Sequence, residues 1–282
     1  MNKALLPRGW QAQLDLEYGL RGNKTRLIKK QQRGPLTLQR SFYPEGDICH
    51  NYILHPPGGV VAGDTLEINV DAGPRTHALL TTPGATKFYR SSGTAAANQT
   101  QNIKVSSGAT LEWLPQQNIF FTGANASLNT VINIDPGGSY AGWEMHCFGR
   151  PANQESFLTG SIASCTTLSI AGELRLVEQL RTDAAATLNA ATGLRGMAMQ
   201  GCFIAGPCHE EQQDSLEQIL QSQIAAGAYP HPVGITLVDE VLIVRALGEQ
   251  TEPMLKLFTE LWTGLRQQWL TVERCVPRIW AT

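Results

Sequence analysis

The sequence is poor in charge and has no excess of either sign. Charged residues make up 16% of its 282 residues, with 22 lysines and arginines against 24 aspartates and glutamates, whereas an average soluble protein has about 25%. A protein that binds nucleic acid or a membrane surface gathers a basic excess into a patch. The balance therefore argues against both kinds of partner, and the low charge leaves more surface for other proteins to cover.

Long hydrophobic runs are also missing. The first ten residues contain no apolar stretch long enough for a signal peptide, and no later segment approaches the roughly 18 uninterrupted apolar residues of a membrane-spanning helix. We therefore expect a cytoplasmic protein. Its 6 cysteines are scattered, with no Cys-x-x-Cys pair, which is typical of reduced, individually packed thiols rather than of disulfides.

Three cysteines have a histidine as a neighbour, but these pairs do not favour a metal site. They are Cys49-His50, His146-Cys147 and Cys208-His209. Adjacent residues of a strand point to opposite faces, so such a pair cannot easily hold one ion. We expect no permanently bound metal, whereas transient contact with an ion such as Ni²⁺ stays open. His55 and His231, each beside a proline, are typical of loop histidines.

The common catalytic motifs are absent as well. There is no phosphate-binding G-x-x-x-x-G-K-[ST], no G-x-G-x-x-G at the start of a helix, no zinc-binding H-E-x-x-H and no G-x-S-x-G around a nucleophilic serine. Polar groups on turns, without a nucleophile motif or a metal cage, favour a binding protein or chaperone over an enzyme.

What the sequence does contain is a long series of short strand patterns. Apolar residues alternate from Trp10 to Leu20, and similar segments follow at spacings of about ten residues as far as Ile204. Short strands at this regular spacing are typical of a β-sandwich, a β-barrel or a β-solenoid. The sequence shows no internal repeat with a period of roughly 20 to 50 residues, which disfavours a true repeat array. Near the C-terminus, a helical period predicts helices at about 209–226 and 252–270. We expect a single β-rich domain over residues 1–282.

The most unusual stretch runs from Tyr52 to Arg90. Its Pro-Pro-Gly-Gly turn at 56–59 reverses the chain, and Asp64 follows where a strand is interrupted. Further along, Lys87 and Arg90 stand beside two aromatic residues. One carboxylate and two cations on glycine-rich backbone within about thirty residues are more than an ordinary connecting loop requires.

Two carboxylates allow more than one interpretation. Asp64 could be a catalytic group, a turn cap or the lining of a polar passage, and an isolated Gly-Asp favours the cap. Glu112 stands between a leucine and a tryptophan in strand-like sequence. It lies either on the solvent face of that strand or buried opposite a cation, for which Lys87 and Arg90 are available.

Two further groups of residues leave alternatives open. Arg150 and Glu155 could complete a network with Glu112, or they could form a surface salt bridge of little energetic weight. The apolar tail around Ile279 and Trp280 should be packed down, because apolar residues close to a terminus are otherwise poorly ordered. It could pack on this chain or on another one.

Seven segments, taken together, resemble the UreD-type urease accessory proteins. They occur in the family's order along the whole chain: Gly9-Trp10, Phe42 to Glu45, Pro57 to Asp64, Thr81 to Ser91, Leu111 to Gln116, Gly149-Arg150 and Pro277 to Thr282. Two positions depart from the family pattern. Ala62 stands where a glycine is common, and Gln154 stands where a glycine is expected before the glutamate.

The resemblance implies a scaffold and metallochaperone. Such a protein would bind apo-urease, an all-helical accessory protein and a nickel-carrying GTPase, and would pass Ni²⁺ through an internal polar tunnel to the urease active site during GTP-dependent maturation. The family fold is mainly β, with many short strands in stacked sheets resembling a β-helix and two helices near the C-terminus. No cofactor is expected to stay bound. Scattered carboxylates and hydroxyls suit passage, because a closed site of cysteines and histidines would trap the ion.

The resemblance also implies roles for particular residues. Six charged residues are candidates for nickel passage or partner contact: Asp64, Lys87, Arg90, Glu112, Arg150 and Glu155. Of these, Asp64, Lys87 and Glu112 match family motif positions. The helix from Pro253 and the Ile279-Trp280 tail are candidates for the surface that faces the helical partner, although packing on the chain's own sheet would explain them equally well.

Two other functions compete with this hypothesis. A metal-dependent hydrolase of unknown substrate would hold an ion tightly and turn over its substrate without help, whereas a scaffold would do neither. A structural β-protein without a metal role would leave nickel enzymes unaffected when it is deleted.

Overall fold

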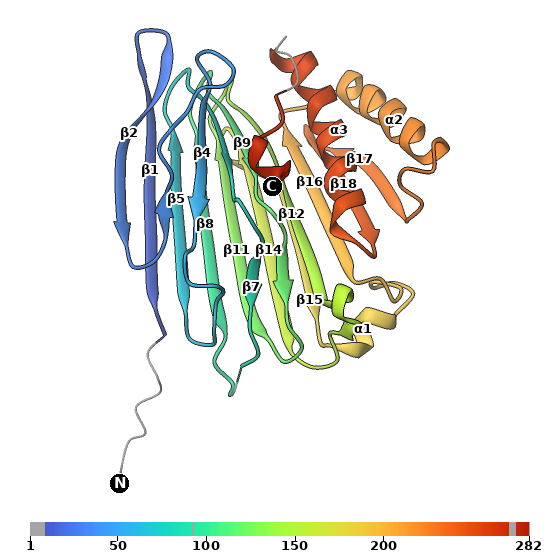
Figure 1. Ribbon diagram of the computed structural model, residues 1–282. Helices are drawn as coiled ribbons and strands as arrows, with labels where there is room; N and C mark the ends of the chain where they lie inside the picture. Colours follow the sequence, from blue (N-terminus) through green and yellow to red (C-terminus); the bar gives the residue numbers. More distant parts are fainter. Residues whose placement is uncertain (1–8, 92, 271–274, 282) are drawn as a thin grey trace.

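Two stacked β-sheets form the body of the protein, and two helices cover the outer face of the second sheet (Figure 1). The computed structural model describes residues 9–91, 93–270 and 275–281. Within this part of the chain, no helix has both the length and the apolar character needed to cross a bilayer.

The first sheet has seven strands, and its four central pairs are parallel. In spatial order the strands are β15 (Glu173–Thr182), β14 (Ser161–Ile170), β11 (Asn125–Ile134), β8 (Ala97–Val105), β5 (Thr65–Ala72), β1 (Gln11–Arg21) and β2 (Lys24–Arg33). The alternation predicted for the first strand is confirmed, since Ala12, Leu14, Leu16 and Tyr18 are all buried. Period-two alternation therefore directs one face of this sheet to the core.

The second sheet faces it with eleven strands. Its main path is β17 (Val233–Val238), β18 (Val241–Gly248), β16 (Met199–Gly206), β12 (Ser139–Arg150), β9 (Thr110–Leu114), β6 (His77–Thr81), β4 (Cys49–Leu54) and β3 (Thr37–Leu38). Three short strands lie beside this path: β7 (Thr86–Phe88), β10 (Asn118–Phe120) and β13 (Glu155–Ser156).

The chain coils between the two sheets. It passes from β5 to β6, from β8 to β9 and from β11 to β12, and each time it leaves the first sheet for the second. Because every turn of the coil lays down its strands in the same direction, β5, β8 and β11 are parallel neighbours, and so are β6, β9 and β12. The mainly β, β-helix-like fold expected from the sequence is confirmed.

Two helices near the C-terminus are also confirmed, α2 (Glu210–Ala225) and α3 (Thr251–Leu270). The ring of Phe258 in α3 packs against Trp143 and Phe203 of the second sheet, so the helices bury an apolar face on that sheet. Three short helical segments were not predicted: α1 (Ala185–Asn189), η1 (Pro151–Asn153) and η2 (Arg278–Ala281).

The C-terminal tail packs on the chain itself. Trp280 lies against the rings of Trp143 and Trp262, and its indole N–H donates a hydrogen bond to Thr81 Oγ1 at 2.9 Å. Ile279 is half-buried. Packing on the chain's own sheet is therefore the alternative that the structure shows for this tail, and contact with a partner stays a prediction. Thr282 lies outside the described residues.

Candidate functional site

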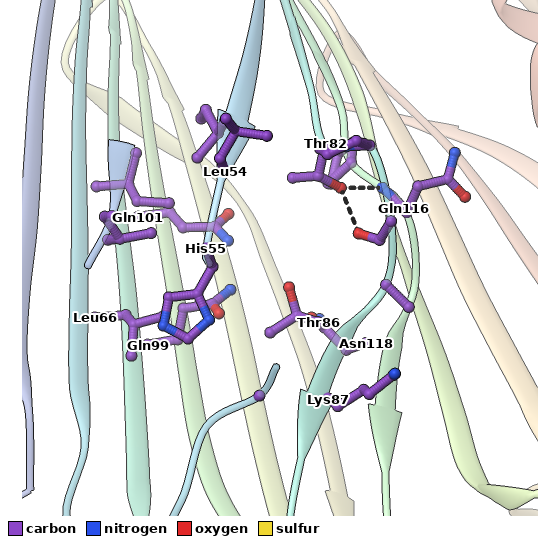
Figure 2. A pocket seen from close by; sticks show the side chains of 18 of the residues that line it. Leu54, His55, Leu66, Thr82, Thr86, Lys87, Gln99, Gln101, Gln116 and Asn118 are labelled. Atoms are coloured by element: carbon purple, nitrogen blue, oxygen red, sulfur yellow. Dashed lines mark hydrogen bonds between the residues drawn. The ribbon is translucent and has the colours of Figure 1, made fainter. Parts of the chain in front are cut away.

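A cavity of about 390 Å³ opens between the two sheets beside the Pro-Pro-Gly-Gly turn (Figure 2). Its mouth is formed by the loop at 55–59 and the segment at 82–87, whose exposed residues face solvent. Figure 2 shows His55 on the same side as Gln99 and Gln101 of the first sheet, with Lys87 on the opposite side. The mouth therefore lies in the stretch that the sequence marks as unusual.

Gly59 and Asp64 fix the shape of the loop at this mouth. A Cβ atom on Gly59 would lie 2.4 Å from Tyr89 Cε2, so a larger residue would not fit without a shift. Asp64 Oδ1 accepts a hydrogen bond from the Trp10 N–H at 2.7 Å, and Oδ2 accepts one from the Val61 N–H at 2.9 Å. Asp64 is thus a buried turn cap, and it is not among the described residues that line the cavity.

Behind the mouth, polar side chains replace apolar ones in the interior. Strand register places Gln101 of β8 beside Thr130 of β11, and Thr130 beside Thr166 of β14. Gln99 and Ser164 occupy the neighbouring inward row of the same strands, and all five residues are only 3% to 7% exposed. We call these five residues the polar stripe. Buried amides and hydroxyls cost free energy unless they are hydrogen-bonded, so the stripe requires polar partners.

Glu144 of β12 supplies such a partner from the opposite sheet. Its Oε1 accepts a hydrogen bond from the Thr130 hydroxyl at 2.6 Å, and its Oε2 accepts one from the Ser164 hydroxyl at 3.3 Å. His146 Nε2 lies 3.7 Å from Glu144 Oε2, and His146 Nδ1 lies 3.4 Å from Asn118 Nδ2. Burial lowers the pKa of His146 despite the opposing effect of the Glu144 carboxylate. The neutral imidazole that results is the form that binds metals.

Glu144 is not among the residues predicted from the sequence. The available signal was the alternation within β12, which directs Glu144 and His146 to the interior while Trp143 and Cys147 pack under the helices. His146 and Cys147 thus point to opposite faces, as expected for neighbours in a strand. Glu144 also lines the cavity, together with Gln99 and Gln101 of the polar stripe, so the inner end of the cavity meets the stripe.

Glu112 belongs to a different site, beneath α3. It is 1% exposed, and its Oε1 accepts hydrogen bonds from Arg266 Nε at 2.7 Å and from Trp262 Nε1 at 3.2 Å. The Nη1 and Nη2 groups of Arg266 donate to the two carboxylate oxygens of Glu45, each at 2.9 Å. The buried alternative for Glu112 is therefore confirmed, with Arg266 as its cation.

The prediction that Lys87 or Arg90 is the cation opposite Glu112 was wrong. Lys87 and Arg90 are both exposed. Lys87 lines the mouth of the cavity, and the stem of Arg90 covers Gly123, where an added Cβ would come within 2.6 Å of Arg90 Cγ. Arg266 lies 154 positions beyond Glu112 along the chain, so no local pattern could have identified it.

The buried carboxylate of Glu112 is expected to make the fold sensitive to acid. Burial alone would raise its pKa, but the charges and hydrogen bonds of His77 and Arg266 lower the pKa from 4.5 to about 2. A carboxylate whose pKa is depressed in the folded state stabilises the fold fully above its unfolded pKa, and this contribution is lost as the pH falls toward the folded pKa. We expect a loss of about 3 kcal/mol between about pH 5 and pH 2.

Urea unfolding of the wild type and of Glu112→Gln at neutral and acidic pH measures this loss. The variant is expected to be less stable at pH 7 and to lose less stability on acidification, because its amide does not titrate. Equal losses in the two proteins would contradict the role of Glu112.

Arg150 and Glu155 form a separate pair at the surface. Arg150 Nε donates to Glu155 Oε2 at 2.7 Å, and the guanidinium lies 4.9 Å from the centre of the Phe121 ring. Their side chains are 40% and 26% exposed. The pair is the surface salt bridge that the sequence allows as one of two alternatives, and such pairs contribute about 0–1 kcal/mol.

A metal ion would find few strong ligands in this region. Among the described residues, no three histidine, cysteine, aspartate or glutamate side chains gather into a group that could hold an ion. Glu144 and His146 together offer one carboxylate and one imidazole, and the polar stripe adds neutral oxygens. An ion at Glu144 would therefore complete its coordination with water and leave easily.

Comparison with known proteins agrees with the resemblance stated from the sequence. The family model described as "UreD urease accessory protein" matches residues 11–281. Proteins named "Urease accessory protein UreD" from Aliivibrio fischeri and Escherichia coli are 45% and 44% identical to this chain over 280 and 274 residues, covering 97% of the chain and 97% and 98% of those proteins. A protein of the same name from Vibrio parahaemolyticus is 43% identical over 274 residues and covers 97% of both chains. Because the match extends over nearly the whole length, this chain belongs to the UreD family of urease accessory proteins.

Proposed function

We propose that this protein is a scaffold and metallochaperone in urease maturation, which receives Ni²⁺ and passes it on through its interior. The family supports a role beside urease. The observation that carries the nickel step is the polar stripe with Glu144 and His146, which continues inward from an open cavity in an otherwise apolar core.

The ligand chemistry of this path suits transfer. Imidazole and carboxylate groups both bind Ni²⁺, and the neutral imidazole of His146 needs no proton loss before it coordinates. Because Glu144 and His146 are only two strong ligands, an ion between them keeps exchangeable water. We infer that the ion dwells briefly at this pair and moves on, with no reaction catalysed by the chain.

We further propose three protein partners: apo-urease, an all-helical accessory protein and a nickel-carrying GTPase. The helix α3 and the tail around Ile279 and Trp280 are the candidate surface for the helical partner. The indole rings of Trp262 in α3 and Trp280 lie 6.3 Å apart, and the Trp262 ring is buried, so the helix and the tail pack directly against each other. Lys87, which is exposed at the cavity mouth, and Arg90, which is exposed three positions further along the chain, are candidates for contact with the nickel donor or acceptor.

The alternative function is a metal-dependent hydrolase of unknown substrate. It requires a tightly held ion and turnover by the isolated chain, and the two strong ligands near the cavity favour it less than transfer. A third function, purely structural, requires that urease obtain its nickel equally well without this chain.

Urease produced together with its other accessory proteins, with and without this chain, tests the proposal. We expect urease to contain little nickel and to have little activity when the chain is absent, and to gain both when it is restored. Equal nickel content in the two preparations would support a purely structural role, and turnover by the purified chain alone would support a hydrolase.

A further inference from the structure

A second hollow lies where the edge strands of the two sheets approach each other. It has a volume of about 440 Å³ and is lined by residues of β15 from the first sheet, of β17 and β18 from the second sheet, and of the loop at 191–195 that follows α1. In Figure 1 this region lies around the labels α1 and β15. None of the residues considered for nickel passage lines it within the described chain.

Three arginines line this hollow from three different elements. Arg181 comes from β15, Arg195 from the loop after α1, and Arg245 from β18, and all three are exposed. No aspartate or glutamate is among the described residues of the lining. Asp183, two positions after Arg181 along the chain, lies outside it. The hollow is thus basic although the chain as a whole has a net charge of -2.

One of the three charges is already compensated. Arg245 Nε lies 2.9 Å from Glu178 Oε1, and Nη2 lies 2.5 Å from Glu178 Oε2, so this bidentate pair links β18 to β15. Arg181 and Arg195 make no ion pair within the part of the chain that the structure describes. Two guanidinium charges are therefore left to act on a ligand in the hollow.

The Arg195 guanidinium is held in place by its own loop. Its Nε donates to the Ala191 carbonyl oxygen at 3.0 Å, and its backbone N–H donates to the Ala190 carbonyl oxygen at 3.2 Å. The backbone of Arg195 has a φ of 54°, a left-handed conformation that costs a non-glycine residue about 1–2 kcal/mol. Glycine would adopt this conformation without that cost. The backbone of the turn therefore does not favour arginine at this position, and the contacts of the side chain must do so.

Guanidinium groups bind carboxylates and phosphates through paired N–H donors. Besides the arginines, the hollow offers the hydroxyls of Thr187 and Thr192 and the apolar side chains of Val233 and Leu247. Its volume falls within the range of about 300–1,000 Å³ that is typical of small-molecule sites. We propose that this hollow is a binding site for a small organic oxyanion, carrying a carboxylate or a phosphate ester, which Arg181 and Arg195 hold together. This site is independent of the proposed nickel path.

Calorimetric titration of the full-length chain at low ionic strength with succinate and with glycerol 3-phosphate tests the proposal. We expect saturable binding of at least one of these probes at one site, and the probe that binds identifies carboxylate or phosphate as the recognised group. In Arg181→Gln/Arg195→Gln the affinity is expected to fall by about tenfold or more, because two charge-assisted contacts are lost. Arg245 is left unchanged, since its pair with Glu178 joins the two sheets.

The matched control is Arg21→Gln, which removes an exposed arginine at the end of β1. It should bind the probe as the wild type does, and the unfolding midpoint of each variant shows that the fold is intact. Absence of saturable binding of both probes to the wild type would overturn the proposal. Unchanged affinity in the double variant would overturn it too, because the probe would then bind without these two arginines. An equal loss of affinity in the Arg21 variant would also overturn it, because binding would then depend on the overall charge of the chain and not on this hollow.

Discussion

Replacing Arg266 with methionine is expected to lower the free energy of unfolding by about 3–5 kcal/mol. The side chain of Arg266 is 2% exposed and contacts the carboxylates of Glu45 and Glu112, which are 10% and 1% exposed. Methionine fills much of the same volume but takes the guanidinium away from both carboxylates, so only the imidazoles of His50 and His77 remain beside them. An uncompensated buried charge is far more costly than the loss of a surface pair.

Urea unfolding of Arg266→Met and of Arg150→Met measures this difference. Arg150 is the matched control, because it also pairs with a glutamate but is 40% exposed, and its loss should cost about 1 kcal/mol or less. Adding Glu112→Leu to Arg266→Met removes one uncompensated charge and should restore part of the stability. If Arg266→Met cost no more than Arg150→Met, the network under α3 would not stabilise the fold as described.

The second large effect is expected on urease activation. Glu144→Gln keeps the size of the side chain and a carbonyl oxygen that can accept the hydrogen bond from Thr130, but it removes the negative charge from the interior. We expect urease activity after maturation at limiting nickel to fall by about tenfold, the scale of effect seen when a metal site loses a tuning interaction. Excess nickel should restore part of the activity, because the remaining ligands still bind weakly.

Glu155→Gln is the matched control for that experiment. It makes the same chemical change at the surface pair with Arg150, away from the polar stripe. Its effect on activation should be small if the path runs past Glu144. A large effect of Glu155→Gln with none of Glu144→Gln would instead support partner contact at Arg150 and Glu155, as the sequence first suggested, and would contradict the interior path.

The fold could be predicted in outline from the sequence, because its signals are local. The alternation in β1 and the helical period of α2 and α3 are properties of neighbouring residues, and both are confirmed. The hairpin of β17 and β18 is equally local, because its two turn residues, Asp239 and Glu240, both have a positive φ, as a tight two-residue turn requires.

The candidate site could be predicted only in part. The stretch with the Pro-Pro-Gly-Gly turn and Lys87 does form the cavity mouth, since it is a continuous segment. The polar stripe depends on the register between β8, β11 and β14, which brings Gln101, Thr130 and Thr166 into one row. No pattern within one segment reveals that row. The pairing of Glu112 with Arg266 could not be predicted for the same reason. Helix α3 packs on the second sheet only after the chain has coiled through the whole fold.

Two of the charged residues picked from the sequence, Asp64 and Glu112, make structural contacts for an equally physical reason. Asp64 stands after a glycine turn because two backbone N–H groups need a cap there. Glu112 sits in an apolar strand because an arginine from α3 compensates it. A carboxylate in an unusual place marks a buried interaction, but the interaction is as often with the chain's own groups as with a ligand.

The nickel content of urease matured at limiting nickel with the wild type, with Glu144→Gln and with Glu155→Gln tests the central claim most directly. If the ion crosses the interior past Glu144, the Glu144→Gln preparation contains markedly less nickel per urease active site, although the variant still co-purifies with urease, and the Glu155→Gln preparation matches the wild type. Equal nickel content in all three preparations would show that the ion reaches urease by another route.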